Sequence, residues 1–304
     1  MQQTTINSSS HSSGLNTAPS SDLRAEDYLP LTPNTATLID FIEDGKDTRH
    51  FRFQLLDPST TGNPEPGQFF MLTLPGAGEA PFTYTVLPDQ QGIFHALVRK
   101  MGQVTTALFQ CQPGTKVGIR GPFGKGWPIN SLADKKVLIV AGGCGLAPLS
   151  CLIDQLIRQQ HPHLALVYGA RNRPLQMLQQ ARQHWQQHIA LFDILEETGG
   201  AQPSDGRQEL KGTPINTMDQ VLEMLEWEPD TLLICGPEGM MKVVAEDFLQ
   251  RGLPANSIWL SIERRMHCAV GTCGHCYLTE HHLSHHYACK DGPTYRWDSL
   301  QPSP

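Results

Sequence analysis

The fold follows most directly from the stretch Val137-Leu138-Ile139-Val140-Ala141-Gly142-Gly143-Cys144-Gly145, an apolar run that ends in a glycine-rich turn. An apolar run without alternation is typical of a strand that is buried on both faces of a parallel sheet. A helix is expected to follow over residues 149–159. Small residues between a strand and a helix allow a pyrophosphate to approach the backbone amides at the helix N-terminus. The stretch therefore predicts a parallel sheet with a nucleotide site, and a tight turn without a ligand is the alternative.

The residues that follow continue the alternation of strands and helices. Strands are expected at 163–168, 190–195 and 231–235, and helices at 174–188, 217–226 and 240–251. This alternation predicts a doubly wound, parallel-sheet nucleotide-binding domain. A second turn, Cys235-Gly236-Pro237-Glu238-Gly239, follows its strand in the same way as the first. Both turns are therefore expected at the carboxyl edge of the sheet, where ligands bind in such folds.

The residues before Lys135 have a different pattern, with short β-like segments. Strands are expected at 37–42, 49–55, 68–74, 92–98 and 116–120, and one short helix at 105–111. Glycine and proline separate the strands at intervals of about ten residues, which is typical of a small antiparallel barrel.

The cysteines fall into two groups. Cys111, Cys144, Cys151 and Cys235 are scattered, whereas Cys268, Cys273, Cys276 and Cys289 lie close together near the end of the chain. The second group begins with C-x4-C-x2-C, the plant-type spacing of ligands to a [2Fe–2S] cluster. Gly271 and Gly274 permit the sharp backbone of such a loop and expose amides to the cluster sulfurs. Zinc, which also accepts four thiolates, and purely structural thiols are the alternatives.

Two polar segments are interpreted as having no catalytic or ligand-binding role. The histidine-rich stretch 281–286 lies between the third and fourth clustered cysteines and is interpreted as a solvated hairpin insertion, with metal binding as the alternative. Residues 1–33 are interpreted as a disordered tail, with docking on a partner as the alternative.

The composition of the 304-residue chain limits its function further. A charged fraction of 17% and a hydrophobic fraction of 39% are typical of globular domains. The net charge of −7 gives no support to nucleic-acid binding, which depends on clustered Lys and Arg. No apolar run reaches the ~18 residues of a membrane span, and the N-terminus lacks an export signal. A cytoplasmic protein is expected.

The order of barrel, nucleotide domain and terminal cysteine cluster resembles the ferredoxin–NADP reductase superfamily. The most specific motif is Glu263-Arg264-Arg265-Met266-His267-Cys268 through Cys276, closed by Cys289-Lys290-Asp291-Gly292-Pro293. Within the superfamily the chain resembles the FAD and [2Fe–2S] diaphorase subunits of cytoplasmic NAD(P)-linked [NiFe] hydrogenases. The electron-transfer subunits of dihydroorotate dehydrogenase B and of anaerobic sulfite reductase are similar in layout.

The resemblance covers residues 34–297 and implies a β plus α/β fold. Its parts would be an N-terminal antiparallel flavin-binding β-barrel at 34–132, a doubly wound parallel-sheet NAD(P)-binding domain at 133–257 and a small C-terminal iron–sulfur lobe at 258–304.

The resemblance also implies a flavin site. Pro81, Phe82 and Thr83 match the family's flavin motif and would lie beside the isoalloxazine ring, with Thr83 near the reactive N5. Ala80 stands where an Arg commonly pairs with a flavin phosphate, a departure shared by the hydrogenase-type branch. The second flavin segment consists of Leu97, Val98, Arg99, Gly102, Gln103, Val104 and Thr105. Arg99 can supply the missing charge, and the amides of 102–105 open a helix suited to phosphate. A strand-end Arg and an ordinary helix cap are the alternatives.

For the nucleotide, the resemblance implies that Gly143, Gly145, Leu146 and Ala147 lie beside the pyrophosphate. Cys235, Gly236 and Pro237 would face the nicotinamide, with Cys235 either near the path of the hydride or simply a buried thiol. Arg171 and Arg173 lie where the adenosine end is held and could bind the 2′-phosphate of NADP. An ordinary loop with two exposed arginines is the alternative.

These expectations combine into an electron-transfer flavoprotein subunit. NAD(P)H would deliver a hydride to FAD, and single electrons would pass through the [2Fe–2S] cluster to the other hydrogenase subunits, in either direction. A sulfite reductase or dihydroorotate dehydrogenase partner is the alternative among enzymes. A zinc-stabilised nucleotide-binding regulator is the alternative of another class.

Overall fold

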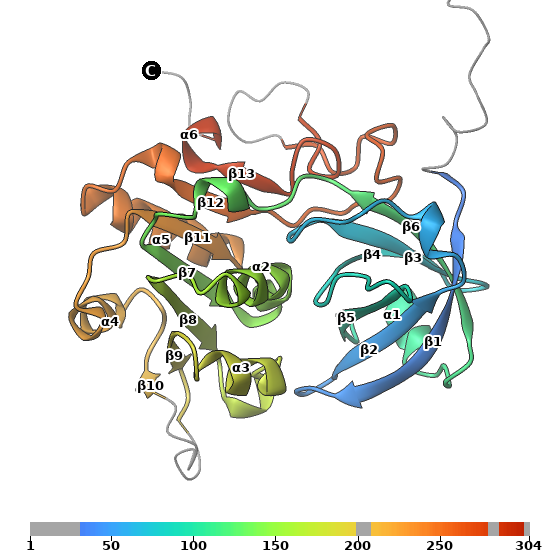
Figure 1. Ribbon diagram of the computed structural model, residues 1–304, viewed down its shortest axis with the longest axis horizontal. Helices are drawn as coiled ribbons and strands as arrows, with labels where there is room; N and C mark the ends of the chain where they lie inside the picture. Colours follow the sequence, from blue (N-terminus) through green and yellow to red (C-terminus); the bar gives the residue numbers. More distant parts are fainter. Residues whose placement is uncertain (1–30, 199–207, 279–285, 301–304) are drawn as a thin grey trace, which may run out of the picture.

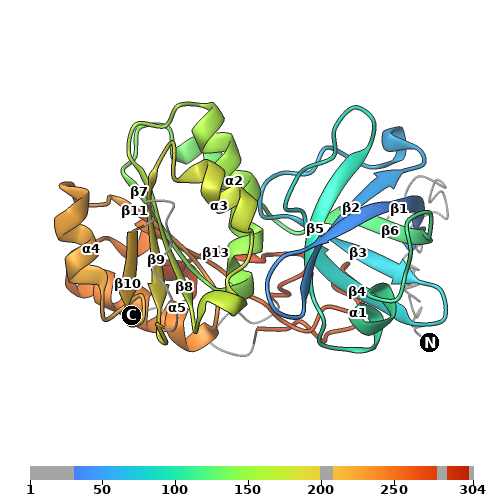
Figure 2. The ribbon, with the colours of Figure 1, turned by 90° about the horizontal axis from the view of Figure 1, so that it is seen from below.

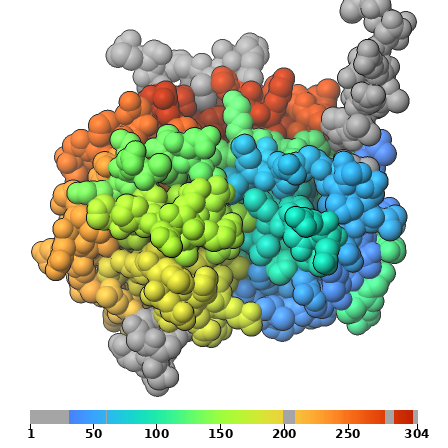
Figure 3. Space-filling model, in the orientation of Figure 1, coloured from blue at the N-terminus to red at the C-terminus, as the bar shows by residue number. Residues whose placement is uncertain are grey.

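The computed structural model describes residues 31–198, 208–278 and 286–300. They form two lobes side by side, and the C-terminal segment, red in Figures 1 and 3, runs across both. Among these residues, no helix has the length and apolar character that a membrane span requires. Most of the predicted tail at 1–33 and of the histidine-rich stretch 281–286 lies outside the described residues.

The first lobe is the predicted antiparallel barrel. Its elements are β1 (Asn34–Glu43), β2 (Thr48–Leu55), β3 (Phe69–Leu74), β4 (Gly78–Thr83), β5 (Ile93–Arg99), α1 (Gln103–Leu108) and β6 (Lys116–Phe123). The strands pair in the order β4-β3-β6-β1-β2-β5. An isolated antiparallel bridge between Val86 and His95 joins the chain after β4 to β5 and so links the two ends of the sheet. Fully buried aromatic side chains such as Phe51 and Phe94 fill the interior.

The sequence analysis missed β4, the strand that carries the predicted flavin motif. Pro81 lacks an amide hydrogen and argues against a central strand. The structure accommodates this proline because β4 is at the end of the strand order and forms its ladder with β3 alone.

The second lobe is the predicted doubly wound domain. Its strands are β7 (Val137–Gly142), β8 (Leu164–Ala170), β9 (Ala190–Leu195), β10 (Gln208–Lys211), β11 (Thr231–Cys235), β12 (Ile258–Ser261) and β13 (Thr294–Arg296). They form a seven-stranded sheet in the order β10-β9-β8-β7-β11-β12-β13. Every neighbouring pair is parallel except β12 with β13. The order reverses between β7 and β11, and the carboxyl ends of these strands form the switch point at which such folds bind ligands.

Helices cover both faces of this sheet (Figure 2). The face toward the barrel carries α2 (Ala147–Arg158) and α3 (Gln179–Trp185), whereas α4 (Met218–Leu225) and α5 (Glu238–Gln250) pack on the other face. A last short helix, α6 (Trp297–Leu300), follows β13. Alternate residues of β7 point to the two faces, so that Leu138 and Ile139 belong to different apolar cores. This arrangement confirms the predicted fold class.

The helix predicted at 174–188 is wrong in its first half. Residues Arg173–Leu175 form a 3-10 turn, Leu178 has a left-handed φ of 52°, and α3 begins only at Gln179. A contact from the barrel fixes this start, because the carboxylate of Asp44 accepts a hydrogen bond of 3.1 Å from the Gln179 amide. A pattern of apolar residues carries no information on such a contact between lobes.

The C-terminal segment takes part in both lobes. Its ends are strands β12 and β13 of the seven-stranded sheet, and Trp297 is buried in the core of the nucleotide lobe. Between these strands, Met266 and Cys289 pack against Phe69 and Phe123 of the barrel. The bounds 34–132, 133–257 and 258–304 stay a proposal, in which the third part would share a sheet with the second.

Candidate functional site

The predicted flavin-motif residues line one small cavity between the lobes. Pro81, Phe82 and Thr83 form its barrel wall, and its volume is about 190 Å³. The other walls include Pro148 of α2 and Met266 of the C-terminal segment. Flat apolar side chains with a hydroxyl at the margin are the kind of lining that suits an aromatic ring system, so these residues fit a flavin.

Glu263, which the sequence analysis named only as part of a motif, lines the same cavity. The side chain is exposed, but the neighbouring protein atoms desolvate its carboxyl in part and so raise the pKa of Glu263 above its usual range. Burial also raises the pKa of the thiols of Cys144 and Cys235, and the negative charge of Glu263 adds to the effect. The cavity lining therefore includes a carboxyl whose pKa is raised by its surroundings.

The residues of the second predicted flavin segment lie in different environments. Val98 is buried in the barrel core, Leu97 contacts the core of the nucleotide lobe, and Arg99 lines a cavity of that lobe. Successive strand residues point to opposite faces, which explains the separation of Leu97 from Val98. The Arg99 guanidinium also lies close enough to the Cys144 thiol to lower its pKa, against the larger effect of burial. Arg99 thus places a positive charge at the boundary between the lobes, and its role at a phosphate stays a prediction.

The predicted phosphate-binding helix start is partly satisfied by its own cap. The hydroxyl of Thr105 accepts hydrogen bonds of 2.9 Å from the amides of Met101 and Gly102. Val104 packs against the barrel core. The Gly102 amide therefore already has a partner, and the ligand contacts predicted for Gly102, Gln103, Val104 and Thr105 stay predictions.

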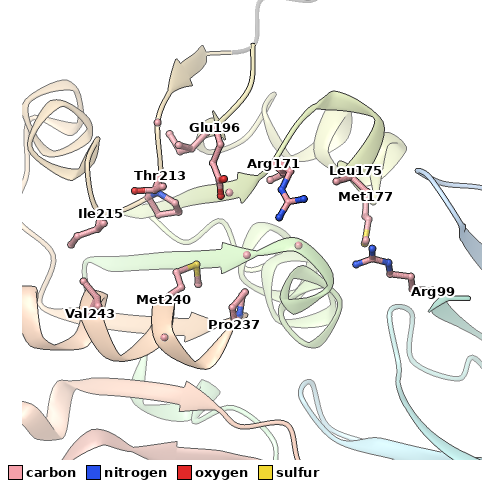
Figure 4. A pocket seen from close by; sticks show the side chains of 18 residues that line it. Arg99, Arg171, Leu175, Met177, Glu196, Thr213, Ile215, Pro237, Met240 and Val243 are labelled. Carbon is pink, nitrogen blue, oxygen red and sulfur yellow. The ribbon is translucent and has the colours of Figure 1, made fainter. Parts of the chain in front are cut away.

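A larger cavity of about 530 Å³ lies at the switch point of the sheet (Figure 4). Four predicted residues line it, namely Arg99, Gly143, Arg171 and Pro237. The sequence analysis did not name the lining residues Glu196, Thr213, Ile215, Met240 and Val243. The position of Glu196 directly after the strand predicted at 190–195 was a usable signal, whereas Thr213 and Ile215 follow the missed strand β10.

The glycines of the first turn serve different purposes. Gly143 has a left-handed φ of 52°, and a Cβ added there would meet nothing within 4 Å, so it presents bare backbone to the cavity. At Gly145 a Cβ would lie 2.3 Å from the carbonyl oxygen of Cys235, so this glycine lets the two turns pack together. Leu146 is fully buried and Ala147 is 8% exposed. Among the described residues, Gly145, Leu146 and Ala147 are not part of the cavity lining, and their place beside a pyrophosphate stays a prediction.

The second turn presents Pro237 to the cavity and keeps Cys235 beneath its surface. Cys235 is 1% exposed, and its thiol donates to the carbonyl of Ser261 at 3.7 Å. Burial raises the pKa of this thiol well above its ordinary value, which keeps it neutral and unreactive. Gly236 packs against the backbone of Gly142. The roles predicted for Cys235 and Gly236 stay predictions, and the surroundings of Cys235 favour the alternative of a buried thiol.

The two arginines after β8 have different surroundings. Arg171 and Glu196 both point into the cavity (Figure 4). Arg173 forms a two-point ion pair with Glu209 of β10, at 2.6 Å for Nη2–Oε1 and 3.0 Å for Nε–Oε2. Since the Glu209 side chain is only 2% exposed, this pair holds Arg173 at the lobe surface, and Arg171 is the arginine of the two that lines the cavity.

The clustered cysteines form two pairs in a loop against the barrel. The sulfurs of Cys276 and Cys289 are 3.1 Å apart, and the thiols of Cys268 and Cys273 are within hydrogen-bonding reach of each other. Within the described ranges, no three His, Cys, Asp or Glu side chains converge closely enough to hold a single metal ion. Two thiol pairs suit a cluster of two irons better than one tetrahedral zinc ion.

The backbone of this loop favours negative charge on sulfur. Burial favours the neutral thiol of Cys268, but hydrogen bonds from the amides of Cys273 and Val270 outweigh it and lower the pKa of Cys268 to about 6. Burial and the adjacent thiol raise the pKa of Cys289 to about 12, against the effect of a hydrogen bond from the Gly271 amide. Amide donors directed at sulfur are a feature of iron–sulfur sites, so the donor set fits such a cluster.

Three family models match successive parts of the chain. They are the oxidoreductase FAD-binding domain at residues 35–127, the oxidoreductase NAD-binding domain at 139–246 and the iron–sulfur cluster binding domain of dihydroorotate dehydrogenase B at 263–301. These matches favour an iron–sulfur cluster over the zinc alternative.

Curated relatives match most of the chain. Sulfhydrogenase 1 subunit gamma of Pyrococcus furiosus is 30% identical over 258 residues, which is 84% of this chain and 86% of the relative. The probable electron transfer subunit of dihydroorotate dehydrogenase B (NAD(+)) from Methanocaldococcus jannaschii is 32% identical over 240 residues, 78% of this chain and 81% of the relative. A solved structure of an NADH-dependent reduced ferredoxin-NADP oxidoreductase, described for flavin-based electron bifurcation, superposes with a TM-score of 0.71 at 26% identity, covering 88% of this chain and 91% of that one.

The cavities, the cysteine loop and these matches agree on the cofactors. The chain is an oxidoreductase subunit that binds FAD, NAD(P) and an iron–sulfur cluster and transfers electrons. It belongs to the family of flavin- and iron–sulfur-containing electron-transfer subunits, within the ferredoxin–NADP reductase superfamily, that includes sulfhydrogenase gamma and the electron transfer subunit of dihydroorotate dehydrogenase B.

Proposed function

We propose that the chain is the diaphorase, or gamma, subunit of a cytoplasmic NAD(P)-linked [NiFe] hydrogenase. The match to two sulfhydrogenase gamma subunits supports this proposal, at 30% and 31% identity over 86% and 84% of their lengths. The Ala80 of the flavin motif, which pairs with Leu72 on the neighbouring strand, is a second feature in its favour because the hydrogenase-type branch shares it.

The order of the three sites supports electron transfer through the chain. Arg99 connects the barrel to the nucleotide cavity, and Pro148 and Glu263 connect the nucleotide lobe and the C-terminal segment to the flavin cavity. Phe69 and Met266 line the flavin cavity and also pack in one apolar cluster with Cys276 and Cys289. The flavin cavity is therefore adjacent to the cysteine loop, and this adjacency is the single structural observation that carries the proposal.

When bound, the flavin and the cluster supply the exchange between two-electron and one-electron chemistry that a nicotinamide lacks. The residues of the chain bind and orient these groups. Arg99 neutralises phosphate charge, Gly143 lets a ligand approach the backbone, and Thr83 offers a hydroxyl at the margin of the flavin cavity. Glu263 lines the same cavity, and partial desolvation raises the pKa of its carboxyl above the usual range, which favours the protonated form.

The second candidate is the electron-transfer subunit of dihydroorotate dehydrogenase B. The iron–sulfur segment at 263–301 matches the model of that enzyme, and its electron transfer subunits are about as similar to this chain as the sulfhydrogenase subunits are. The sulfite reductase alternative from the sequence analysis predicts the same cofactors.

Identification of the copurifying subunit tests these candidates. The tagged chain is isolated from its own host, its partners are identified by mass spectrometry, and NAD(P)+ reduction is measured with hydrogen and with dihydroorotate. A copurifying [NiFe] subunit with hydrogen-dependent reduction is the expected result. Dihydroorotate-dependent reduction with a dihydroorotate dehydrogenase subunit would replace the proposal by the second candidate, and a sulfite reductase subunit would replace it by the third.

The metal assignment is tested on the isolated chain. We expect Cys273→Ser to abolish the reduced-state EPR signal of the cluster, whereas Cys151→Ser, at a buried thiol that donates to the Tyr84 carbonyl in the barrel, leaves it in place. An unchanged signal in Cys273→Ser would show that the ligands are misassigned. A protein without flavin absorption and with zinc in place of iron would support the regulator alternative.

A further inference from the structure

Arg120 of β6 is a buried cation that lies between the flavin strand and the cysteine loop. Its side chain is 6% exposed and forms a two-point ion pair with Glu79 of β4, at 2.6 Å for Nη2–Oε2 and 2.9 Å for Nε–Oε1. Thr73 donates a further hydrogen bond of 2.7 Å to the Glu79 carboxylate. Burial favours protonation of Glu79, but the donors Arg120 and Thr73 outweigh it and hold the pKa of Glu79 below its usual range. The pair is therefore ionised.

The other edge of the guanidinium faces the cysteine loop. Nη1 and Nη2 of Arg120 donate to the backbone carbonyl oxygen of Cys268 at 3.2 and 3.3 Å. The guanidinium also lies 5.4 Å from the centroid of the Phe123 ring, which packs in the same apolar cluster as Cys276 and Cys289. One planar cation thus connects β4, which carries the predicted flavin motif, to the residue predicted as the first cluster ligand.

We propose that Arg120 is a positioning residue that fixes the cysteine loop to the flavin strand and that its charge, balanced by Glu79, sets the reduction potential of the cluster. The inference rests on the proposed assignment of Cys268, Cys273, Cys276 and Cys289 as cluster ligands. It gives a redox role to the last residue of the strand that the sequence analysis expected at 116–120.

The sign of the effect follows from electrostatics. Reduction adds one negative charge to the cluster, so a nearby positive charge raises the reduction potential and a nearby negative charge lowers it. The guanidinium contacts the loop directly through its Nη1–Nη2 edge, whereas the Glu79 carboxylate accepts from the adjoining Nε–Nη2 edge. Removing the positive charge leaves an uncompensated buried carboxylate, and removing the negative charge leaves an uncompensated guanidinium.

The test is an EPR-monitored redox titration of the full chain with its cofactors. We expect Arg120→Gln to lower the midpoint potential of the cluster and Glu79→Gln to raise it. Each change corresponds to at least a threefold change in the equilibrium constant for one-electron reduction, about 30 mV at 59 mV per tenfold. The double variant restores a neutral pair and is expected between the two single variants.

A purely structural role would not give opposite signs. Shifts in the same direction, or no shift in either variant with the signal retained, would overturn the inference. If Arg120→Gln fails to hold a cluster, Glu79→Gln decides alone, since it keeps the contact of Arg120 with Cys268, and an unchanged or lowered potential overturns the inference. The control Arg52→Gln removes a half-exposed partner of Asp40 elsewhere on the barrel and is expected to leave the potential unchanged. A wild-type chain without the reduced-state signal would overturn the ligand assignment itself and this inference with it.

Discussion

The nucleotide cavity and the cysteine loop are two sites that we propose for ligands, and they are built by different parts of the chain. The nucleotide cavity is formed by strand ends and turns of a sheet that is buried on both faces, and its shape follows from backbone packing. The buried side chains of the cysteine loop are mostly small, among them Ala269 and Ala288, and they pack against the barrel wall, to which Arg120 also binds the loop. We expect a site of the first kind to exist before its ligand binds and a site of the second kind to depend on side-chain contacts and on the metal.

The first prediction concerns a substitution that disrupts the packing of the two turns in the nucleotide lobe. A Cβ at Gly145 would lie 2.3 Å from the carbonyl oxygen of Cys235, so Gly145→Ala forces two turns of the sheet apart. We expect the free energy of unfolding to fall by about 3 kcal/mol, the range of severe core substitutions. Urea unfolding, followed by circular dichroism, measures this loss.

Gly239→Ala is the matched control. Gly239 is an exposed residue of α5 at which a Cβ would meet nothing within 4 Å. Because alanine is the better helix former, stability should be unchanged or raised by up to about 1 kcal/mol. Equal losses in the two variants would contradict the distinction between glycines that pack and glycines that are free.

The second prediction concerns the adenosine end of the nucleotide cavity. Glu196 and Arg171 both line it, and they have opposite effects on a 2′-phosphate. A carboxylate repels the phosphate and accepts a hydrogen bond from a free ribose hydroxyl, whereas an arginine attracts the phosphate. We expect Glu196→Gln to raise the ratio of kcat/KM for NADPH over NADH about tenfold, or about 1.4 kcal/mol, and Arg171→Ala to lower it.

Glu197→Gln is the control for this change of preference. The Glu197 carboxylate accepts a hydrogen bond from Asn172 at 3.1 Å and is not among the described residues that line the cavity. In this variant the ratio of kcat/KM for NADPH over NADH should stay at the wild-type value. Equal losses on both nucleotides in Arg171→Ala would refute the 2′-phosphate clamp.

The third prediction is that removal of iron affects the cysteine loop but not nucleotide binding. Because β12 and β13 hold the ends of the C-terminal segment in the sheet, a chelated protein should keep both lobes folded. Its dissociation constant for NADH should change by less than about threefold, or about 0.7 kcal/mol. Proteolytic cleavage should become faster between Glu263 and Asp291. Nucleotide binding measured by calorimetry, with cleavage sites mapped by mass spectrometry, provides the check, and loss of nucleotide binding would show that the sites are not separate.

The sequence predicted what depends on local pattern. Neighbouring residues alone determine three such features: the apolar run at 137–141, the strand at 190–195 and the spacing of the cysteines. Strand β4 and the start of α3 could not be predicted in this way, since one tolerates Pro81 by its place in the sheet and the other depends on Asp44 of the other lobe. Glu263 was recognised only as part of a motif and Arg120 only as the end of an expected strand, because the chemistry of both depends on surrounding residues far away in the chain.

The turn between β1 and β2 has a consequence for evolution. The Lys46 amide donates to the carbonyl of Pro174 at 2.7 Å, and a Cβ at Gly45 would lie 2.6 Å from the carbonyl oxygen of Gln176. These contacts hold the segment whose Leu175 and Met177 form part of the nucleotide cavity wall. A lineage that exchanged one barrel for another would therefore also change the support of this cavity wall, and with it part of the coenzyme selectivity that we propose for the nucleotide lobe. We expect evolution to accept a substitution in the turn together with a compensating substitution in residues 174–177.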